Sequence, residues 1–126
     1  MKILITGAEG FIGLALVNLL VAESSQVDEI ICMIRKKEST VLQESSKIKI
    51  VSHDLQSSTS PKLSKGIDII IHLAAISKTF LSSIDGRNQL LTNILTTSNV
   101  LKIAEETKAK KLIFASSVYV YSGIKA

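Results

Sequence analysis

A glycine-rich segment near the amino terminus has the residue types and spacing of a phosphate-binding turn. It reads Thr6-Gly7-Ala8-Glu9-Gly10-Phe11-Ile12-Gly13. A short apolar run, Lys2 to Thr6, precedes it, and a longer apolar segment, Phe11 to Ser24, follows it. A strand that leads through glycines into a helix is the context in which such a turn binds the phosphates of a dinucleotide.

Each glycine of this turn has a steric reason. Gly7 lets the chain turn sharply, Gly10 lets backbone N–H groups approach a pyrophosphate, and Gly13 lets the helix pack closely on the strand. The amino end of the helix then faces the anionic phosphates. The alternative interpretation is a tight strand-to-helix turn that binds no ligand.

A basic cluster, Ile34-Arg35-Lys36-Lys37, ends the next apolar run. About 20 residues beyond the glycines, a site selective for NAD has Asp or Glu to accept from the ribose 2′-hydroxyl. A carboxylate there would repel a 2′-phosphate, whereas Arg35 can hold one through paired hydrogen bonds, with Lys36 or Lys37 adding attraction. The cluster therefore favours NADP over NAD as the cofactor. The alternative interpretation is a solvated basic turn.

Five short apolar runs predict the strands that position these residues. They are Lys2 to Thr6, Ile30 to Ile34, Lys47 to Val51, Ile67 to Leu73 and Lys111 to Ala115. Continuous β-branched runs indicate strands buried on both faces, as in a parallel sheet under helices. We expect an α/β, Rossmann-like doubly wound sheet of five parallel strands in the order 3-2-1-4-5. The nucleotide site is expected over the carboxyl ends of strands 1 and 4.

Two further segments predict helices. Phe11 to Ser24 is long and apolar enough for a buried helix, and Gly86 to Lys108 spaces its apolar residues as a helix does. The apolar positions of the second segment are 90, 91, 94, 95, 101 and 104. We expect this apolar face to cover the sheet. Asp54 to Gly66, which holds the only proline, is expected to form a loop or at most one turn of helix.

The composition excludes several classes of protein. The 126 residues are expected to form one domain, residues 1–126, and the single cysteine, Cys32, excludes an internal disulfide. No Cys/His spacing suits zinc, so no metal site is expected. No apolar segment is long enough for a signal peptide or a membrane span, which favours a cytoplasmic protein without a membrane partner. The net charge of +4 is spread along the chain, so no nucleic-acid partner is expected.

Further runs carry a resemblance to a known family. Besides the glycine turn they are His53-Asp54-Leu55, Asp68 to Ala75, Asn93 and Ala115 to Tyr121. In this order the chain resembles the cofactor-binding N-terminal part of the extended short-chain dehydrogenase/reductase family, the NAD-dependent epimerase/dehydratases. The family's usual Asn-x-x-Gly-Thr run lacks its glycine here, because the chain reads Asn93-Ile94-Leu95-Thr96-Thr97.

The resemblance implies roles for individual residues. Asp54 corresponds to the family's adenine-contacting carboxylate, and small residues after the fourth strand leave room for the ribose and nicotinamide end of the cofactor. Ser117 stands at the catalytic serine position. The cofactor-binding residues expected are Gly7, Gly10, Phe11, Ile12, Gly13, Arg35, Asp54, Leu55, Leu73, Ala74, Ala75 and Asn93.

Taken singly, four of these matches also fit a purely structural role. Asp54 can cap a turn, His72 can be a satisfied core histidine, Asn93 can be a surface helix residue, and Ser116-Ser117 can simply end a strand. Together, however, the matches stand in the family's order along the whole chain.

The resemblance implies an NAD(P)-dependent epimerase, dehydratase or reductase that acts by hydride transfer on a small-molecule substrate, a nucleotide sugar or a similar hydroxyl or carbonyl compound. The alternative is a non-catalytic NADP-sensing or regulatory module. A phospho-acceptor receiver domain has the same sheet plan but needs paired acids where this chain has Thr6-Gly7-Ala8. Family members often pair through the helices beside the fourth and fifth strands, which leaves a homodimer open.

The family's catalytic tyrosine and lysine form a Tyr-x-x-x-Lys helix, where the lysine lowers the pKa of the tyrosine so that it acts as a general base. The family enzymes are longer than this chain. Tyr121 and Lys125 match the string literally, but Tyr121 closely follows Ser117, and Gly123 falls within the turn of helix that would be needed. We therefore expect Tyr121 to belong to the strand end and the 126-residue chain alone to have no turnover.

Overall fold

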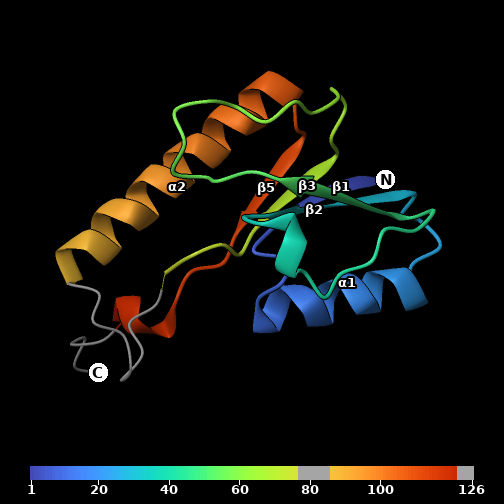
Figure 1. Ribbon diagram of the computed structural model, residues 1–126, viewed down its shortest axis with the longest axis horizontal. Helices are drawn as coiled ribbons and strands as arrows, with labels where there is room; N and C mark the ends of the chain where they lie inside the picture. Colours follow the sequence, from blue (N-terminus) through green and yellow to red (C-terminus); the bar gives the residue numbers. More distant parts are fainter. Residues whose placement is uncertain (77–85, 122–126) are drawn as a thin grey trace.

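The computed structural model describes residues 1–76 and 86–121, which form a parallel sheet with a long helix on each face (Figure 1). The strands are β1 (Lys2–Thr6), β2 (Glu29–Ile34), β3 (Ile48–Ser52), β4 (Ile69–His72) and β5 (Lys111–Phe114). They are all parallel and pair in the order β3-β2-β1-β4-β5. The predicted fold class and strand order are confirmed. The order reverses between β1 and β4, so the switch point of the sheet lies there.

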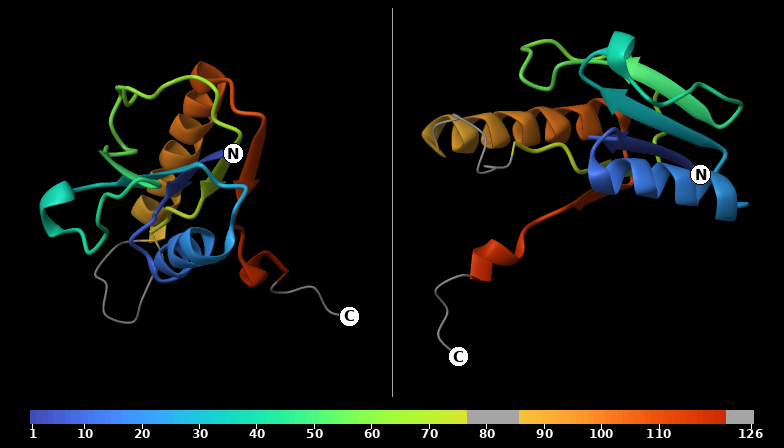
Figure 2. Two further views of the ribbon diagram at one scale, coloured as in Figure 1. Left: turned by 90° about the vertical axis from the view of Figure 1, so that its right-hand side faces the viewer. Right: turned by 60° about the horizontal axis from the view of Figure 1, so that its bottom comes forward.

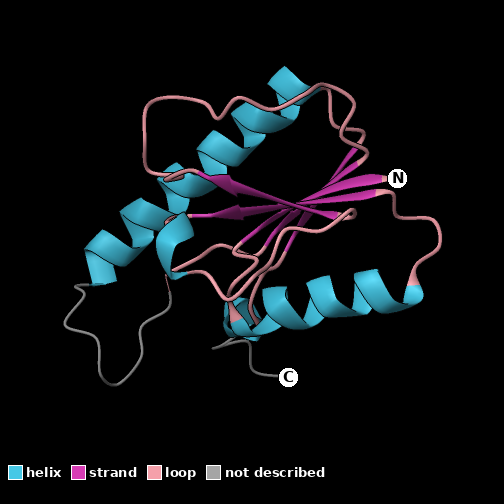
Figure 3. Cartoon of the chain, turned by 45° about the vertical axis from the view of Figure 1, so that its right-hand side comes forward, coloured by secondary structure: helices cyan, strands magenta, loops and turns pink. Residues whose placement is uncertain are grey.

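The helices are α1 (Phe11–Glu23), α2 (Gly86–Thr107) and two short 3-10 turns, η1 (Lys37–Ser39) and η2 (Val118–Tyr121). Figure 3 shows the sheet nearly edge-on between α1 and α2. This placement follows from chain handedness, because right-handed crossovers that leave β1 and β4 in opposite directions put their helices on opposite faces. The segment 54–66 contains no helix, as expected.

Two apolar cores flank the sheet. Ile3 and Ile5 pack with Val17 of α1, whereas Leu4 packs with Val100 and Ile103 of α2, because successive side chains of a strand point to opposite faces. β1 and β2 are buried on both faces, as their continuous apolar runs predict.

β5 departs from that prediction. It is an edge strand, and Ile113 and Phe114 are exposed. Only β4 pairs with it in the described part of the chain. The prediction of burial on both faces is wrong for β5, because an apolar run alone does not tell an edge strand from a central one.

The helices are also less buried than predicted. Only Gly13 and Val17 of α1 are buried, so the expectation of a buried helix holds for one face alone. In α2 the residues predicted to cover the sheet are mostly exposed: Leu90, Leu91, Ile94, Leu95 and Leu101. The buried positions are Thr96, Val100, Ile103 and Thr107, and Ala104 packs beside them.

The length of α2 explains much of this difference. The helix has 22 residues and β4 has 4, which correspond to about 33 Å of helix and about 13 Å of strand. The first half of α2 therefore extends past the carboxyl edge of the sheet, as Figure 2 shows. Helical spacing identifies the helix, but it does not show how much of the helix lies over the sheet. Within the described ranges, no helix combines the length and apolar character needed to cross a membrane.

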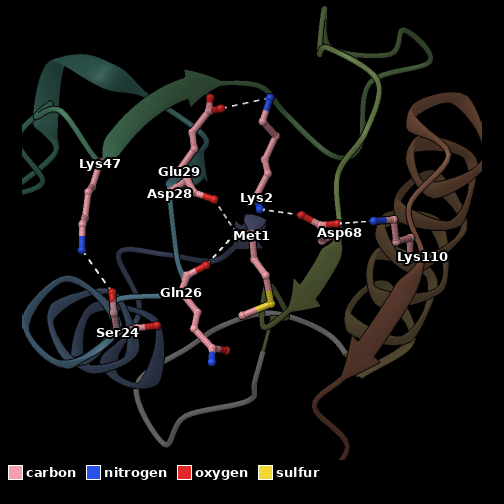
Figure 4. A network of polar contacts seen from close by, with 9 residues as sticks. All are labelled: Met1, Lys2, Ser24, Gln26, Asp28, Glu29, Lys47, Asp68 and Lys110. Atoms are coloured by element: carbon pink, nitrogen blue, oxygen red, sulfur yellow. Dashed lines mark hydrogen bonds and ion pairs between the residues drawn. The ribbon is translucent and has the colours of Figure 1, made fainter.

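The amino ends of the strands are joined by a polar network (Figure 4). The Asp68 carboxylate accepts from the backbone N–H of Lys2 at 2.7 Å and pairs with Lys110 Nζ at 2.6 Å. Lys2 Nζ also pairs with Glu29 Oε2 at 3.0 Å. The hydrogen bond from Lys110, followed by that from Lys2, lowers the pKa of Asp68 below its ordinary value. This edge of the sheet lies opposite the glycine turn, and ion pairs and hydrogen bonds join its strands.

Candidate functional site

Gly7 begins a turn that packs directly on the backbone beyond β4. Its φ is +69°, a left-handed conformation that favours glycine. A Cβ on Gly7 would lie 2.7 Å from the backbone nitrogen of Ala74, too close for any side chain. The turn is closed by the N–H of Gly10, which donates to the Gly7 carbonyl at 3.0 Å.

Gly10 and Gly13 bring α1 against this turn. A Cβ on Gly13 would fall on the Gly7 carbonyl oxygen and 2.8 Å from Ala8 Cα. Gly10 precedes α1 and has no side chain with which to cap the first N–H groups of the helix, so these donors remain available to an anion. The predicted residues Phe11 and Ile12 start the helix with exposed side chains, and Phe11 is 96% exposed.

A cavity of about 260 Å³ lies beside the turn at the carboxyl edge of the sheet. The predicted residues that line it are Gly7, Arg35, Asp54, Leu55, Ala74, Ala75 and Asn93. The predicted residues that do not line it are Gly10, Phe11, Ile12, Gly13, Leu73 and Ser117. The fold thus brings predicted residues from five separate segments to one cavity, over the strand ends where the site is expected.

The cavity also has lining residues that the sequence analysis missed: Ala8, Glu9, Met33, Ile34, His53, Gln56, Ile76, Thr92 and Thr96. Some of them carry a signal that was available. Thr92 and Thr96 are within one helical turn of Asn93, and Gln56 is two residues from Asp54. His53 directly precedes Asp54, and the register between β2 and β3 sets it beside Arg35.

Asp54 both caps a turn and borders the cavity. Its Oδ1 accepts from the N–H of Gln56 at 2.9 Å, which is the turn-capping arrangement. Its side chain is nevertheless exposed at the cavity wall. The carboxylate keeps further acceptor capacity for a ligand donor, because one N–H uses only part of it.

His72 is a satisfied core histidine. It is 2% exposed, with Nδ1 2.7 Å from Thr6 Oγ1 and Nε2 3.2 Å from Thr97 Oγ1. Thr97 donates its hydroxyl proton to the Asn93 carbonyl at 2.8 Å, so His72 Nε2 is the donor to Thr97 and Nδ1 accepts from Thr6. The imidazole is neutral in this arrangement, and burial lowers its pKa.

Asn93 fixes the wall of the cavity that follows β4. Its Oδ1 accepts from the N–H of Ile76 at 2.8 Å, and its Nδ2 donates to the Ile76 carbonyl at 2.9 Å. Gln89, one turn earlier in α2, donates to the same carbonyl at 2.9 Å. Asn93 is therefore a positioning residue rather than a plain surface helix residue.

The basic cluster divides between the cavity and solvent. Arg35 lines the cavity, but Lys37 Nζ pairs with Glu44 Oε1 at 3.1 Å on the surface. The hydrogen bond from Lys37 lowers the pKa of Glu44. Among the basic residues of the cluster, only Arg35 is placed to meet a ligand in the cavity.

The predicted catalytic residue lies apart from this cavity. Ser117 is exposed in the segment between β5 and η2, which in Figure 2 leads away from the sheet. Its carbonyl accepts from the N–H of Val120 at 3.1 Å. Tyr121 ends η2 with an exposed side chain, whereas β5 ends at Phe114, so the expectation that Tyr121 belongs to the strand end is wrong. Lys125 lies outside the described residues.

The lining of the cavity suits an extended anionic ligand. At one end, Gly7 packs so closely on the Ala74 backbone that no Cβ fits, and the first N–H groups of α1 next to this turn have no side-chain cap. The other end carries a guanidinium, a carboxylate and a histidine whose Nε2 is shielded from solvent without a hydrogen-bond partner in the described structure. These features fit the pyrophosphate and adenosine parts of a dinucleotide.

Strand order, glycine turn and cavity together define a doubly wound, Rossmann-like α/β protein. The chain belongs to the NAD dependent epimerase/dehydratase family, whose model matches residues 3–125.

Individual relatives give the same result. D-erythronate dehydrogenase of Haemophilus influenzae is 29% identical over 127 residues, covering 98% of this chain and 40% of the relative. A solved UDP-galactose 4-epimerase is 28% identical with a TM-score of 0.79, covering 100% of this chain and 41% of that one. MoeE5 in complex with UDP-glucuronic acid and NAD is 26% identical with a TM-score of 0.75, covering 100% and 40%. This chain spans about 40% of the length of these relatives.

Proposed function

We propose that the chain binds a nicotinamide dinucleotide in the cavity beside the glycine turn, as the cofactor-binding part of an epimerase, dehydratase or reductase. The observation that carries the proposal is the contact of Gly7 with the Ala74 backbone, with the cavity directly beside it. Such a cradle has a steric reason when a ligand's phosphates must approach the backbone.

Each part of the cofactor has residues suited to hold it. The pyrophosphate would meet the first N–H groups of α1 after Gly10, and the adenosine would lie toward Arg35, Asp54 and Leu55. The nicotinamide end would lie along Ala74 and Ala75, whose small side chains leave room for it. When bound, the nicotinamide ring accepts or returns a hydride.

We infer that the cofactor is NADP rather than NAD. Arg35 lines the adenosine end of the cavity, where an NAD-selective site has a carboxylate. A guanidinium forms paired, charge-assisted hydrogen bonds with a phosphate. Lys37 adds little, because it is paired with Glu44.

The proposed substrate is a nucleotide sugar or a similar hydroxyl or carbonyl compound. UDP-galactose 4-epimerase and MoeE5, which binds UDP-glucuronic acid, support the first, and D-erythronate dehydrogenase supports the second. Ser117 is the residue of this chain proposed to bind the reacting hydroxyl, and its exposed position leaves it accessible to a substrate. A non-catalytic NADP-binding module remains the second candidate, favoured by the separation of Ser117 from the cavity.

Calorimetric titration with NADP⁺ and NAD⁺ tests the cofactor proposal. The parent chain is expected to bind NADP⁺ more tightly, and Arg35→Asp to reverse or abolish the preference, because it sets a carboxylate against the 2′-phosphate. Lys37→Asp is the matched control, since Lys37 is outside the cavity. Equal affinities in the parent would contradict the role of Arg35, and binding of neither cofactor would contradict the proposed function.

A further inference from the structure

His53 is a lining residue of the cavity with an unexplained polar atom. Its Nε2 is shielded from solvent and has no hydrogen-bond partner among the described residues. A buried polar atom without a partner lowers the stability of the folded chain, so in native proteins such atoms almost always meet a protein group, a water or a ligand. Because His53 lines the cavity beside Asp54, a rotation of its ring that turns Nε2 to the cavity would let a ligand group supply the missing partner.

The register of the sheet sets His53 beside Arg35. β2 and β3 pair with Ile34 opposite Ser52, and the N–H of His53 donates to the Ile34 carbonyl at 2.8 Å. Arg35 and His53 are therefore the next residues along two neighbouring parallel strands. The hydroxyl of Ser52 also donates to the Arg35 carbonyl, at 3.1 Å, which ties the two strand ends together.

Side-chain alternation sends Arg35 and His53 to the same face. Met33 and Val51 both pack in the core on the α2 side of the sheet. The residues two positions further, Arg35 and His53, follow them on that side, because strand side chains alternate with a period of two. Both side chains therefore lie at the same end of the cavity, and both residues are part of its wall.

We propose that His53 is a second specificity-determining residue of this cavity, whose Nε2–H donates to the 2′-phosphate of NADP that Arg35 also binds. This inference rests on the proposed binding of NADP. A phosphate has three strong acceptor oxygens, so it can accept a pair of hydrogen bonds from a guanidinium and another from an imidazole. The neighbouring Asp54 forms no hydrogen bond with Nε2 in the described structure.

Two small ligands isolate this contact from the rest of the cofactor. 2′,5′-ADP carries the adenosine end with one 2′-phosphate and one 5′-phosphate, and 5′-AMP is the same molecule without the 2′-phosphate. Titration calorimetry of the 126-residue chain is expected to show tighter binding of 2′,5′-ADP. His53→Phe keeps an aromatic ring but has no donor, and it is expected to weaken the binding of 2′,5′-ADP about tenfold and to leave the binding of 5′-AMP unchanged.

His53→Gln is the conservative variant, because its side-chain amide offers an N–H near the position of the imidazole Nε2. It is expected to restore part of the preference for 2′,5′-ADP. In the ¹⁵N-labelled parent, the Nε2 resonance of His53 is expected to shift with 2′,5′-ADP and to stay unchanged with 5′-AMP. This second measurement needs no variant, so it holds even where His53→Phe fails to fold.

The outcomes separate this inference from the proposals on which it rests. If His53→Phe weakens the binding of both ligands equally, or if the Nε2 resonance does not respond to the 2′-phosphate, His53 only packs or stacks in the cavity. The proposal that the chain binds NADP would then stand. If Arg35→Ser loses the preference for 2′,5′-ADP and His53→Phe keeps it, Arg35 alone determines the preference. If the parent binds neither NADP⁺ nor NAD⁺, both the proposed function and this inference are wrong.

Discussion

Gly7 is the residue of the glycine turn that packs against the backbone of the segment following β4. It shares a positive φ with Gly66, which has +85°, but their surroundings differ. A Cβ on Gly7 would meet the Ala74 backbone, whereas a Cβ on Gly66 would have nothing within 4 Å. The two glycines therefore share a left-handed backbone conformation, but only Gly7 lies close to another segment of backbone. Gly66 can serve as the matched control for Gly7.

Gly7→Ala is expected to abolish cofactor binding, and Gly66→Ala to leave it unchanged. Both variants lose roughly 1–2 kcal/mol of unfolding free energy to the left-handed backbone, and Gly7→Ala loses more because the turn must move from Ala74. Urea unfolding and calorimetric titration with NADP⁺ measure the two effects. Full binding in a folded Gly7→Ala would show that the close approach does not shape the site.

The burial of His72 makes the free energy of unfolding depend on pH. Burial lowers its pKa below 6.5, so between that value and the folded pKa the unfolded chain binds a proton that the folded chain does not. The free energy of unfolding therefore falls as the pH drops below 6.5, by at most about 1.4 kcal/mol per pH unit. Asp68 and Glu44, whose pKa values are lowered, act in a more acidic range, because their ordinary values are 3.8 and 4.5.

His72→Gln is expected to remove this slope, as followed by urea unfolding between about pH 5 and pH 7. His53 remains in the variant and serves as the internal control. A slope in His72→Gln equal to that of the parent would assign the pH dependence to another group.

At the scale of elements, the strands are the feature that the sequence predicts best. The continuous apolar runs predicted all five strands and, with right-handed crossovers, their order, because a parallel sheet buries its central strands on both faces. The strand ends were less certain: β2 begins at Glu29, one residue before its predicted start, and β4 is shorter than Ile67 to Leu73. Strand ends are set by pairing with neighbours, which the residues of one run do not reveal.

The sheet-covering face of α2 could not be predicted from its apolar spacing. Ile103 is 2% exposed and packs on the sheet, whereas Ile94 is 57% exposed on the same helix. The two residues are nine positions apart, which at about 100° per residue puts them on opposite faces of the helix. His53 was missed as a cavity residue although it directly precedes Asp54, and its position beside Arg35 follows from the pairing of β2 with β3.

The same substitution at these two positions tests the orientation of α2. Ile103→Ala is expected to lower the free energy of unfolding by about 2–5 kcal/mol, because it removes a buried side chain and leaves a cavity. Ile94→Ala is expected to change it by less than about 0.5 kcal/mol. Urea unfolding of both variants measures this, and similar losses at the two positions would mean that α2 faces the sheet differently.

At the scale of the whole molecule, the cavity and the catalytic position are separate. The cavity is lined from β1 to α2 by residues of this chain, while Ser117 and Tyr121 lie exposed beyond β5. Hydride transfer also needs a group that takes the hydroxyl proton, and none of these exposed side chains meets the cavity. The described part of the chain is therefore expected to bind the cofactor but not to catalyse the reaction.

The 126-residue chain is accordingly expected to have no turnover with NADP⁺ or NAD⁺ and UDP-galactose, UDP-glucuronic acid or D-erythronate. Absorbance of the reduced nicotinamide follows oxidation, and chromatography of the sugar nucleotides follows epimerisation. Tyr121→Phe is assayed beside the parent. Turnover in the parent that disappears in Tyr121→Phe would mean that Tyr121 is the catalytic tyrosine after all.

Amide hydrogen exchange, measured residue by residue with and without saturating NADP⁺, tests the central claim most directly. We expect slower exchange at Gly7 to Gly13, at Arg35 and His53 to Gln56, and at Ala74 to Ile76. The amino-end network around Lys2, Asp68 and Lys110 in Figure 4 is expected to change no more than the rest of the molecule. Protection centred on that amino end, or no protection at the glycine turn, would contradict a dinucleotide site at the carboxyl edge of the sheet.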